Sequence, residues 1–437
     1  VEVLRVRYVP VTQPTDSVGV AAPWPDPLPP FAGPIDLAAG KNQPLWVRVK
    51  VPRDAPAGKY AGSVSLTAKG YQVEVPLQVE VYDFVLPDRM TCVSAYGFSP
   101  GEVWRYQKVT DPQQRRAVLD KYWANYSAHH ISPYDLAPLD PVEVTWPSAS
   151  DWQGGSRDRT VKHAGQSALL VADESATAQT SSVYGVAIPL PAGGVRLRFW
   201  YKTKAPGGQF VVTFNHSDAS DQWMSGRNND MRMDGTGEWQ QFDRTVTSFP
   251  GGAKSFRLTL WAALWADDGS PTGTVWYDDL SLQDAATGQE LVKGGDFEPT
   301  APALLKPVFD WTAWDAAMTK AIDQHHFNSF CLPIPGLGGG TFHSRTEPSL
   351  LGYGEDTPEY KAAFRNYVQA VQEHLREKGW LDEAFVYWFD EPDPKDYEFV
   401  MNGFRKLKEA APDLTRMLTE QVEPALTGGP NLWCPVS

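Results

Sequence analysis

Three cysteines in 437 residues are too few, and odd in number, for a disulfide framework. Cys92, Cys331 and Cys434 each lie inside an apolar, strand-like run, so we expect buried free thiols. No apolar run approaches the roughly 20 residues that span a bilayer. Basic residues are in the minority: 39 Lys and Arg against 53 Asp and Glu give a net charge of −14 and a pI near 5.1. That balance argues against nucleic acid or an anionic membrane as partner.

Aromatic residues are abundant, with 17 Trp, 17 Tyr and 19 Phe making up 12% of the sequence. Aromatic rings stack on sugars, but they also fill sandwiches and barrels, so composition alone favours packing. At 437 residues the chain is long enough for about two or three domains. It begins at Val1 without a methionine or signal peptide and stops straight after a strand, so we expect a fragment cut at both ends.

Residues 1–89 show the pattern of an all-β domain. Residues 45–51 and 71–81 alternate apolar and polar side chains with period two. Residues 52–58 supply a turn between them, and the proline-rich residues 23–34 are unsuited to a central strand. Short strands separated by turns predict an immunoglobulin-like β-sandwich at the N-terminus.

Residues 90–140 and 301–437 instead alternate strands with amphipathic helices. We predict six strands, at 92–98, 131–136, 327–334, 384–389, 415–419 and 431–435, and helices at 111–130, 314–322, 358–380 and 395–411. Asp111 caps the first helix, with Pro112 at its first position. Repeated β-α units predict a (β/α)8 barrel of TIM type. A closed barrel needs about eight strands, so we expect this one to be truncated at its C-terminal end.

Residues 141–300 interrupt this alternation with strands among Gly, Asp and Ser turns and no good helix. The pattern predicts a β jelly roll inserted after the second barrel strand. Four tryptophans are candidates for stacking on sugars, although as a group they are better explained as core: Trp223, Trp239, Trp261 and Trp265. Asp278 and Asp279 are weak candidates for a structural Ca²⁺, with a strand-end turn as the alternative.

The most informative segment is residues 384–392, where an apolar and aromatic run ends in Asp390, Glu391 and Pro392. An apolar run between two helices is typical of a buried parallel strand. Acidic residues at the carboxyl end of such a strand lie where α/β barrels place their chemistry. The alternative is structural, because an acidic residue before Pro394 can cap the next helix. We favour a catalytic site, and with it an enzyme.

The two acids are neighbours on one strand, which limits the mechanism. Glycosidases usually place two carboxylates on different strands, about 5 Å apart when retaining and about 6.5–9.5 Å apart when inverting. Asp390 and Glu391 approach a substrate from one side and do not easily supply both protonation and backside attack. Without a third carboxylate, the nucleophile is water or part of the substrate, and a 2-acetamido carbonyl is the known internal nucleophile. Tyr387, Trp388 and Phe389 would supply an apolar setting for the acid.

Two parts of the chain resemble glycoside hydrolase family 123. Residues 52–60, read together with residues 82–87, are similar to its N-terminal β-sandwich, and residues 387–392 resemble its catalytic strand. Members are β-N-acetylgalactosaminidases that use substrate-assisted retention on a (β/α)8 barrel. The resemblance implies that Asp390 polarises the acetamido group, that Glu391 is the acid/base, and that N-acetylgalactosamine is the preferred sugar.

Residues 141–300 are similar, more loosely, to carbohydrate-binding jelly rolls through residues 163–169 and 275–280. We therefore expect a carbohydrate partner, no nucleic acid and no membrane-spanning segment. Such a function favours secretion or the periplasm. We expect no organic cofactor and no catalytic metal. The pairs His129-His130 and His325-His326 end helices, where a cationic side chain suits the dipole better than it suits metal ligation.

Six further residues are candidates for substrate binding: Trp388 beside the acids, and Tyr96, His343, Arg345, Glu420 and Gln421 at or near strand ends. His343 and Arg345 follow the glycine-rich residues 336–340, for which we expect a mobile lid. A carboxylate of Glu420 facing the sugar would make the mechanism a conventional two-carboxylate retaining one. A non-catalytic glycan-binding or scaffold protein is the other alternative.

Overall fold

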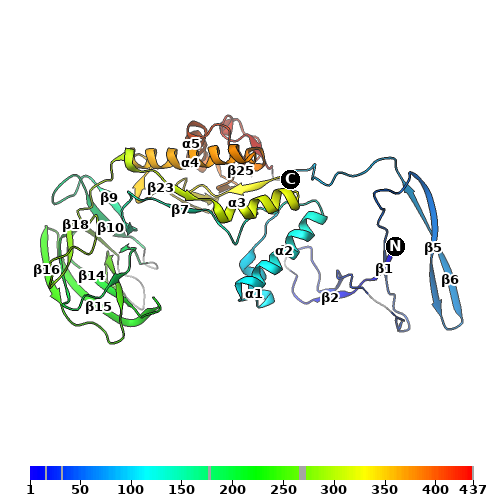
Figure 1. Cartoon of the computed structure of the whole chain (residues 1–437), viewed down its shortest axis with the longest axis horizontal. Coiled ribbons are helices and arrows are strands. Elements are labelled where there is room, and N and C mark those ends of the chain that lie inside the picture. The colour runs from blue at the N-terminus through cyan, green and yellow to red at the C-terminus, as the bar shows by residue number, and fades with distance from the viewer. Residues whose placement is uncertain (15–16, 31–32, 176–178, 265–271, 436–437) are drawn as a thin grey trace. The chain divides into compact units, whose positions relative to one another are not determined.

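The computed structural model describes residues 1–14, 17–30, 33–175, 179–264 and 272–435, and it divides into two units, Val1–Asp88 and Arg89–Ser437 (Figure 1). Across these described ranges, no helix is long and apolar enough to cross a membrane.

The first unit consists of three separate antiparallel strand pairs. They are β1 (Glu2–Arg5) with β4 (Leu45–Arg48), β2 (Tyr8–Val11) with β3 (Ala22–Pro25), and the hairpin of β5 (Gly58–Ala68) with β6 (Tyr71–Val81) (Figure 1). The predicted strands are therefore confirmed. The predicted immunoglobulin-like sandwich is not formed in the described residues of this unit. The strand pairs do not stack into two facing sheets, and most of their apolar side chains face solvent; Tyr71, for example, is 61% exposed.

The second unit contains a parallel sheet covered by helices. Its strands, in order, are β20 (Phe330–Leu332), β25 (Ala384–Val386), β27 (Thr415–Leu418) and β28 (Leu432–Trp433). Its helices are α1 (Pro100–Gln107), α2 (Pro112–Ala128), α3 (Thr312–Thr319), α4 (Pro358–Lys378) and α5 (Tyr397–Ala410). Helix α3 runs on into a π-helical turn, Lys320–Gln324.

Two earlier segments continue this sheet in chain order. Tyr96 and Pro133 form a parallel bridge, and the Tyr134 amide donates to the Tyr96 carbonyl at 2.8 Å. The Cys331 amide then donates to the Tyr134 carbonyl at 2.9 Å, which joins this pair to β20. Four of the six predicted strands therefore form parallel strands, whereas residues 92–98 and 131–136 meet at a single parallel bridge and form no regular strand. A complete eight-stranded barrel is not evident in the described residues.

Local signals in the sequence define the helix ends. Asp111 accepts a hydrogen bond from the Gln114 amide at 2.9 Å at the start of α2, which confirms the predicted cap. Thr357 caps α4 in the same way through the Tyr360 amide, and Pro112 and Pro358 take the first helical positions. The helices bury one face against the sheet in a single core.

The inserted residues form a β-sandwich of two antiparallel sheets, as predicted. One sheet has the order β16 (Gln240–Val246), β13 (Val195–Thr203), β18 (Gly273–Asp284), β10 (Ala168–Asp173), β9 (Ser156–Asp158). The other has the order β15 (Trp223–Thr236), β14 (Pro206–Ser217), β17 (Ser255–Trp261), β11 (Ser181–Tyr184), β8 (Trp152–Gln153), with β12 (Ile188–Pro189) beside β17. Phe199, Phe214 and Tyr277 are fully buried between them. At the base of the insertion, β7 (Glu143–Thr145) pairs with β19 (Val308–Asp310).

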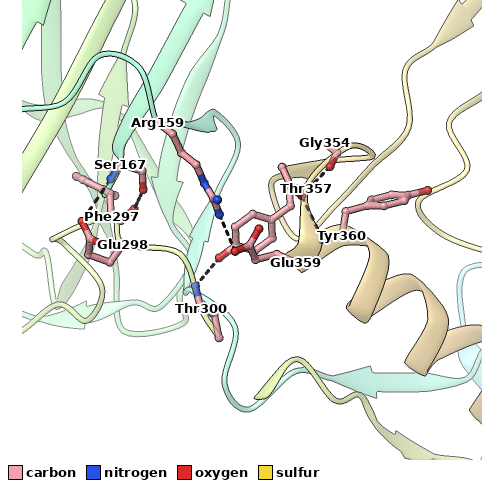
Figure 2. A network of polar contacts seen from close by, with 10 residues as sticks. Arg159, Ser167, Phe297, Glu298, Thr300, Gly354, Thr357, Glu359 and Tyr360 are labelled. Atoms are coloured by element: carbon pink, nitrogen blue, oxygen red, sulfur yellow. Dashed lines mark hydrogen bonds and ion pairs between the residues drawn. The ribbon is translucent and has the colours of Figure 1, made fainter. Parts of the chain in front are cut away.

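The sandwich contacts the start of α4 through polar side chains (Figure 2). Arg159, just after β9, donates to Glu359 Oε1 at 2.6 Å. The Thr300 amide donates to the Tyr353 hydroxyl at 2.9 Å. Tyr353 belongs to a short hairpin, β23 (Ser349–Leu350) and β24 (Tyr353–Gly354), that leads into α4.

The expectation of three buried thiols is wrong for two of them. Cys92 and Cys434 are exposed, and Cys331 is half-buried; none is in a disulfide. Cys92 lies outside any regular strand, and Cys434 follows the last strand rather than lying within it. An apolar neighbourhood in the sequence therefore did not place these two side chains in the core.

Candidate active site

Asp390 and Glu391 lie at the carboxyl end of the parallel sheet, as the sequence predicts. Strand β25 is followed by the short β26 (Phe389–Asp390), which pairs in parallel with β21 (Gly339–Thr341), Thr341 being opposite Asp390. On its other side Asp390 forms a parallel bridge with Thr419, the residue after β27. Chain segments on both sides therefore fix the backbone at this point.

The Asp390 carboxyl group is held by two hydroxyl groups. Thr419 Oγ1 donates to Asp390 Oδ1 at 2.8 Å, and the Tyr387 hydroxyl donates to the same oxygen. Burial, together with the hydrogen bond to Asp390, raises the pKa of Tyr387, so this hydroxyl remains a donor at neutral pH. One oxygen of Asp390 is thus occupied, and the group has a defined orientation.

Glu391 combines a strained backbone with an uncommitted side chain. Its φ angle of 44° lies in the left-handed region, which is uncommon for residues other than glycine. Its amide donates to Thr419 Oγ1 at 3.0 Å. Within the described residues its half-buried carboxyl group has no hydrogen bond or ion pair. Strained residues are concentrated at functional sites, where the surrounding structure holds them.

A cavity of about 400 Å³ is lined by Tyr387, the hydrogen-bond partner of Asp390, but not by Asp390 or Glu391 themselves. Its sheet side includes Tyr134, Asp135, Cys331 and Tyr387, and its helix side includes aromatic residues such as Trp311. The rings of Tyr134 and Tyr387 lie 6.3 Å apart. The volume falls within the range of ordinary ligand sites, and the lining is mostly apolar with a few polar groups, as such sites usually are.

Sequence reasoning missed Tyr134 and Asp135. Burial raises the pKa of the Asp135 carboxyl group. The Ala137 amide, which donates to Oδ1 at 2.9 Å, acts in the opposite direction and lowers this pKa. Burial also raises the pKa of the Tyr134 hydroxyl. The signal that could have found both residues is their position, because they lie at the end of the second predicted strand just as Asp390 lies at the end of the fourth.

Trp388 is not brought to the carboxylates. Its ring packs against Phe399 and Phe404 of α5, with ring centres 5.6 and 5.9 Å away. A side chain at Gly403 would meet this ring at 2.3 Å. Tyr387 and Trp388 lie in the extended link between β25 and β26, where Tyr387 contacts Asp390 and Trp388 contacts α5.

The structure places His343 and Arg345 in a hairpin fixed beside the site. Strand β21 pairs with β22 (Ser344–Thr346), and both residues are exposed. Arg345 reaches Asp396 at 3.5 Å and lies over the Phe399 ring at 4.9 Å, and Lys395 donates to the Phe342 carbonyl at 3.0 Å. The hairpin of β21 and β22, for which the sequence predicts a mobile lid, is paired with β26 and contacts the residues around the start of α5.

The remaining substrate-binding candidates lie at strand ends. Tyr96 is 59% exposed at the end of the first parallel segment. Glu420 and Gln421 directly follow Thr419, and Glu420 Oε1 accepts the Gln421 amide at 2.7 Å. Glu420 is half-buried and Gln421 exposed. All three lie at the same end of the sheet as Asp390. The residue that contacts Asp390 there is Thr419, which precedes Glu420.

The weak calcium candidates in the sandwich hold a loop instead. Asp278 is 1% exposed, and its carboxyl group accepts the amides of His163, Ala164 and Asp279 at 2.8, 3.1 and 2.9 Å. Asp279 Oδ2 lies 2.8 Å from Nδ1 of His163, whose ring stacks on Trp200. Within the ranges that the structure describes, no three His, Cys, Asp or Glu side chains could together hold a metal ion.

Three of the four candidate tryptophans lie within the described residues, and their surroundings differ. Trp223 is 59% exposed, Trp239 packs at 5.6 Å from the His163 ring, and Trp261 is half-buried at the end of β17. Trp265 lies outside the described residues.

A second candidate site lies on the outer face of the six-stranded sheet. In β14, Phe210 and Phe214 belong to the core, so the alternate residues Val211 and Thr213 face outward. Both are nevertheless buried, at 1% and 0% exposure. Thr213 Oγ1, and Oδ1 of Asn228 on neighbouring β15, are buried without a hydrogen-bond partner among the described residues. Buried polar atoms usually have partners, so these two unpartnered oxygens distinguish this face of the sheet.

Several solved structures of carbohydrate-binding modules are similar to about a third of this chain. A family 30 module of a cellulosomal cellulase of Clostridium thermocellum has 14% identity and a TM-score of 0.26, covering 33% of this chain and 96% of that one. A family 16 module has 20% identity and a TM-score of 0.22, covering 31% and 89%. The C-terminal family 22 module of Clostridium thermocellum Xyn10B has 14% identity and a TM-score of 0.24, covering 34% and 88%. No protein-family model matches the chain, and no curated protein matches it.

Proposed function

We propose that the chain carries the active site of a glycosidase that cleaves β-linked N-acetylhexosaminides by substrate-assisted retention. The observation that supports this most is the unequal state of the two neighbouring acids. Asp390 is fixed by two hydroxyl donors, while the Glu391 carboxyl group is free among the described residues. A fixed acid suits the orientation of a substrate group, and a free acid suits proton transfer. By its resemblance to glycoside hydrolase family 123, the preferred sugar is N-acetylgalactosamine.

The roles follow from these positions. The free oxygen of Asp390 would accept the N–H of the substrate acetamido group and orient its carbonyl oxygen toward the anomeric carbon. As that oxygen forms a bond to the anomeric carbon, the glycosidic bond breaks and Glu391 gives its proton to the leaving oxygen. Glu391 then takes a proton from the water that opens the bicyclic intermediate. Two displacements at one carbon leave the anomeric configuration unchanged.

A conventional two-carboxylate mechanism requires an acid facing Asp390 and Glu391 from another strand. Glu420 is next to Thr419, and one of its oxygens is occupied by the Gln421 amide. Asp135 lines the cavity, and one of its oxygens is occupied by the Ala137 amide. Each of these carboxyl groups is engaged through one oxygen, as Asp390 is, so inhibition by a thiazoline analogue is the observation that separates the two mechanisms.

The full-length protein should be assayed on aryl β-N-acetylgalactosaminides and β-N-acetylglucosaminides, beside the Glu391→Gln and Asp390→Asn variants. We expect turnover by the wild type and a loss of about 10²–10⁴-fold in Glu391→Gln, the usual contribution of general acid–base catalysis. A thiazoline analogue of the intermediate should inhibit the wild type strongly. Turnover without thiazoline inhibition would favour a conventional retaining glycosidase, and no turnover in any form would reject the enzyme.

We propose glycan binding by the sandwich as a second function, independent of catalysis. It is favoured by the unpartnered oxygens of Thr213 and Asn228 on the outer face of β14 and β15. Titration calorimetry with soluble polysaccharides would test it, comparing the wild type with Thr213→Val. Binding that weakens about fivefold in the variant supports this face, since one hydrogen bond is worth about 1 kcal/mol. Unchanged binding would place the glycan elsewhere.

A further inference from the structure

Thr419 contacts both acids of the candidate site through one hydroxyl group. Its Oγ1 donates to Asp390 Oδ1 at 2.8 Å and accepts the Glu391 amide at 3.0 Å. The sequence reasoning selected the next two residues, Glu420 and Gln421, and passed over this one. No other described side chain is hydrogen-bonded to both Asp390 and Glu391.

The hydrogen atoms can be assigned from the chemistry of the groups. A hydroxyl has one hydrogen to donate, and Thr419 gives it to Asp390, whose ionised carboxyl group can only accept. Tyr387 also gives its hydrogen to Asp390, so its 3.1 Å contact with Thr419 Oγ1 joins two oxygens that donate to the same carboxylate. A lone pair of Thr419 remains for the Glu391 amide.

The hydrogen bond from the Glu391 amide to Thr419 Oγ1 lies where the backbone conformation is unfavourable. Glu391 has a φ of 44°, which is unfavourable for a residue with a β-carbon. Pro392 follows directly and also restricts the residue before it, disfavouring a helical continuation. The Thr419 hydroxyl holds this peptide at the point where the side chain of Glu391 leaves the backbone.

We propose that Thr419 is a positioning residue of the active site, which fixes the carboxyl group of Asp390 and the backbone of Glu391 together. This inference rests on the proposed glycosidase function. Because both contacts pass through one oxygen, a displacement of β27 relative to β26 would move both acids at once. The orientation of the Asp390 carboxyl group and of the Glu391 peptide therefore depends on the neighbouring chain segment at Thr419.

The test compares three variants of the full-length protein on an aryl β-N-acetylgalactosaminide. Thr419→Val keeps the shape and removes the hydroxyl, Thr419→Ser keeps the hydroxyl, and Thr415→Val is a control at the far end of the same strand. We expect Thr419→Val to lower kcat about 100-fold with KM changed by less than about threefold, because small misplacements of catalytic groups have effects of this size. Thr419→Ser should recover most of that loss, and Thr415→Val should behave as the wild type.

Two further measurements separate positioning from damage to the fold. Titration with the thiazoline analogue counts competent sites, and a positioning role predicts full stoichiometry in Thr419→Val despite its slow turnover. Hydrogen exchange at the Glu391 amide needs no substrate: exchange should be at least about tenfold faster in Thr419→Val than in Thr419→Ser.

The outcomes are distinguishable from failure of the proposed function. If the wild type and Glu391→Gln are equally inactive, the glycosidase is rejected and the positioning role with it. If the wild type is active but Thr419→Val keeps kcat within about threefold, the glycosidase stands and the inference is overturned. It is also overturned if Thr419→Ser loses as much activity as Thr419→Val, or if the Glu391 amide exchanges equally in both variants.

Discussion

Arg159 Nη2 lies 2.6 Å from Glu359 Oε1, although the two residues are 200 positions apart in the chain. Arg159 follows β9 of the inserted sandwich, and Glu359 is in the first turn of α4. The Glu359 side chain is only 4% exposed, and its other oxygen is buried without a partner among the described residues. A carboxylate at a helix N-terminus is favourable, but a buried one requires its cation. The contact therefore fastens the insertion to the α/β part (Figure 2).

We expect Arg159→Met to lower the free energy of unfolding by ~2 kcal/mol. The loss is smaller than for a fully buried pair because the Arg159 side chain is 43% exposed, but Glu359 would be left as an uncompensated charge. Urea denaturation would measure it. The control is Arg376→Met, which breaks an ion pair with Asp413 whose side chains are 50% and 57% exposed and should cost less than ~1 kcal/mol. Equal losses in the two variants would contradict a special role for the buried pair.

The sequence pattern was sufficient for elements that local signals define. The order of the four parallel strands, the Asp111 cap and the all-β insertion followed from periodicity, capping residues and turn composition. The N-terminal sandwich did not follow, because alternation identifies strands such as β5 and β6 but not the partners that cover their faces. The strand pairs of that unit accordingly leave their apolar side chains exposed.

The candidate site was only partly predictable, for a similar reason. Acids at a strand end indicated Asp390 and Glu391, but contacts between strands depend on register. At the end of the fifth segment, register selects Thr419 rather than its neighbour Glu420. Within a strand that is apolar on both faces, the sequence could not show that Tyr387 faces the acids and Trp388 faces α5.

We expect Gly403→Ala to destabilise the protein by ~1–3 kcal/mol. A β-carbon at Gly403, in α5, would lie 2.3 Å from the Trp388 ring, so the ring or the helix must move. Gly101→Ala in α1 is the matched control, because nothing lies within 4 Å of its β-carbon position. There alanine should stabilise by ~0.5–1 kcal/mol through its higher helix propensity. Thermal denaturation of both variants checks the prediction, which a neutral Gly403→Ala would contradict.

We expect Asp278→Ala to destabilise the sandwich by ~1–2 kcal/mol, because the buried Asp278 carboxyl group is the acceptor for the part-buried amides of His163, Ala164 and Asp279. Asp279→Ala should cost less than ~1 kcal/mol, because its contact with His163 is near the surface. A chelator should leave the melting temperature of the wild type unchanged, since Asp278 already has protein partners. A fall in melting temperature on chelation, restored by Ca²⁺, would instead support a metal at these residues.

Tyr367 predicts how stability depends on pH in alkaline solution. Burial raises the pKa of Tyr367 to about 12, and its ring lies between Phe309 at 5.1 Å and Trp146 at 6.4 Å. An unfolded tyrosine ionises near pH 10, so above that pH the unfolded state binds fewer protons than the folded state. The stability that neutral Tyr367 contributes is therefore fully present below about pH 10 and is lost as the pH rises toward about 12.

Urea denaturation at several pH values between about 9 and 11.5 would show this loss. In Tyr367→Phe there is no hydroxyl to ionise, so the free energy of unfolding should fall less steeply over the same range, by up to ~2 kcal/mol. Tyr106→Phe is the control, because Tyr106 is 74% exposed in α1 and its replacement should leave the slope as it is in the wild type. Parallel pH profiles for the wild type and Tyr367→Phe would mean that the Tyr367 hydroxyl is as well hydrated in the folded protein as in the unfolded chain.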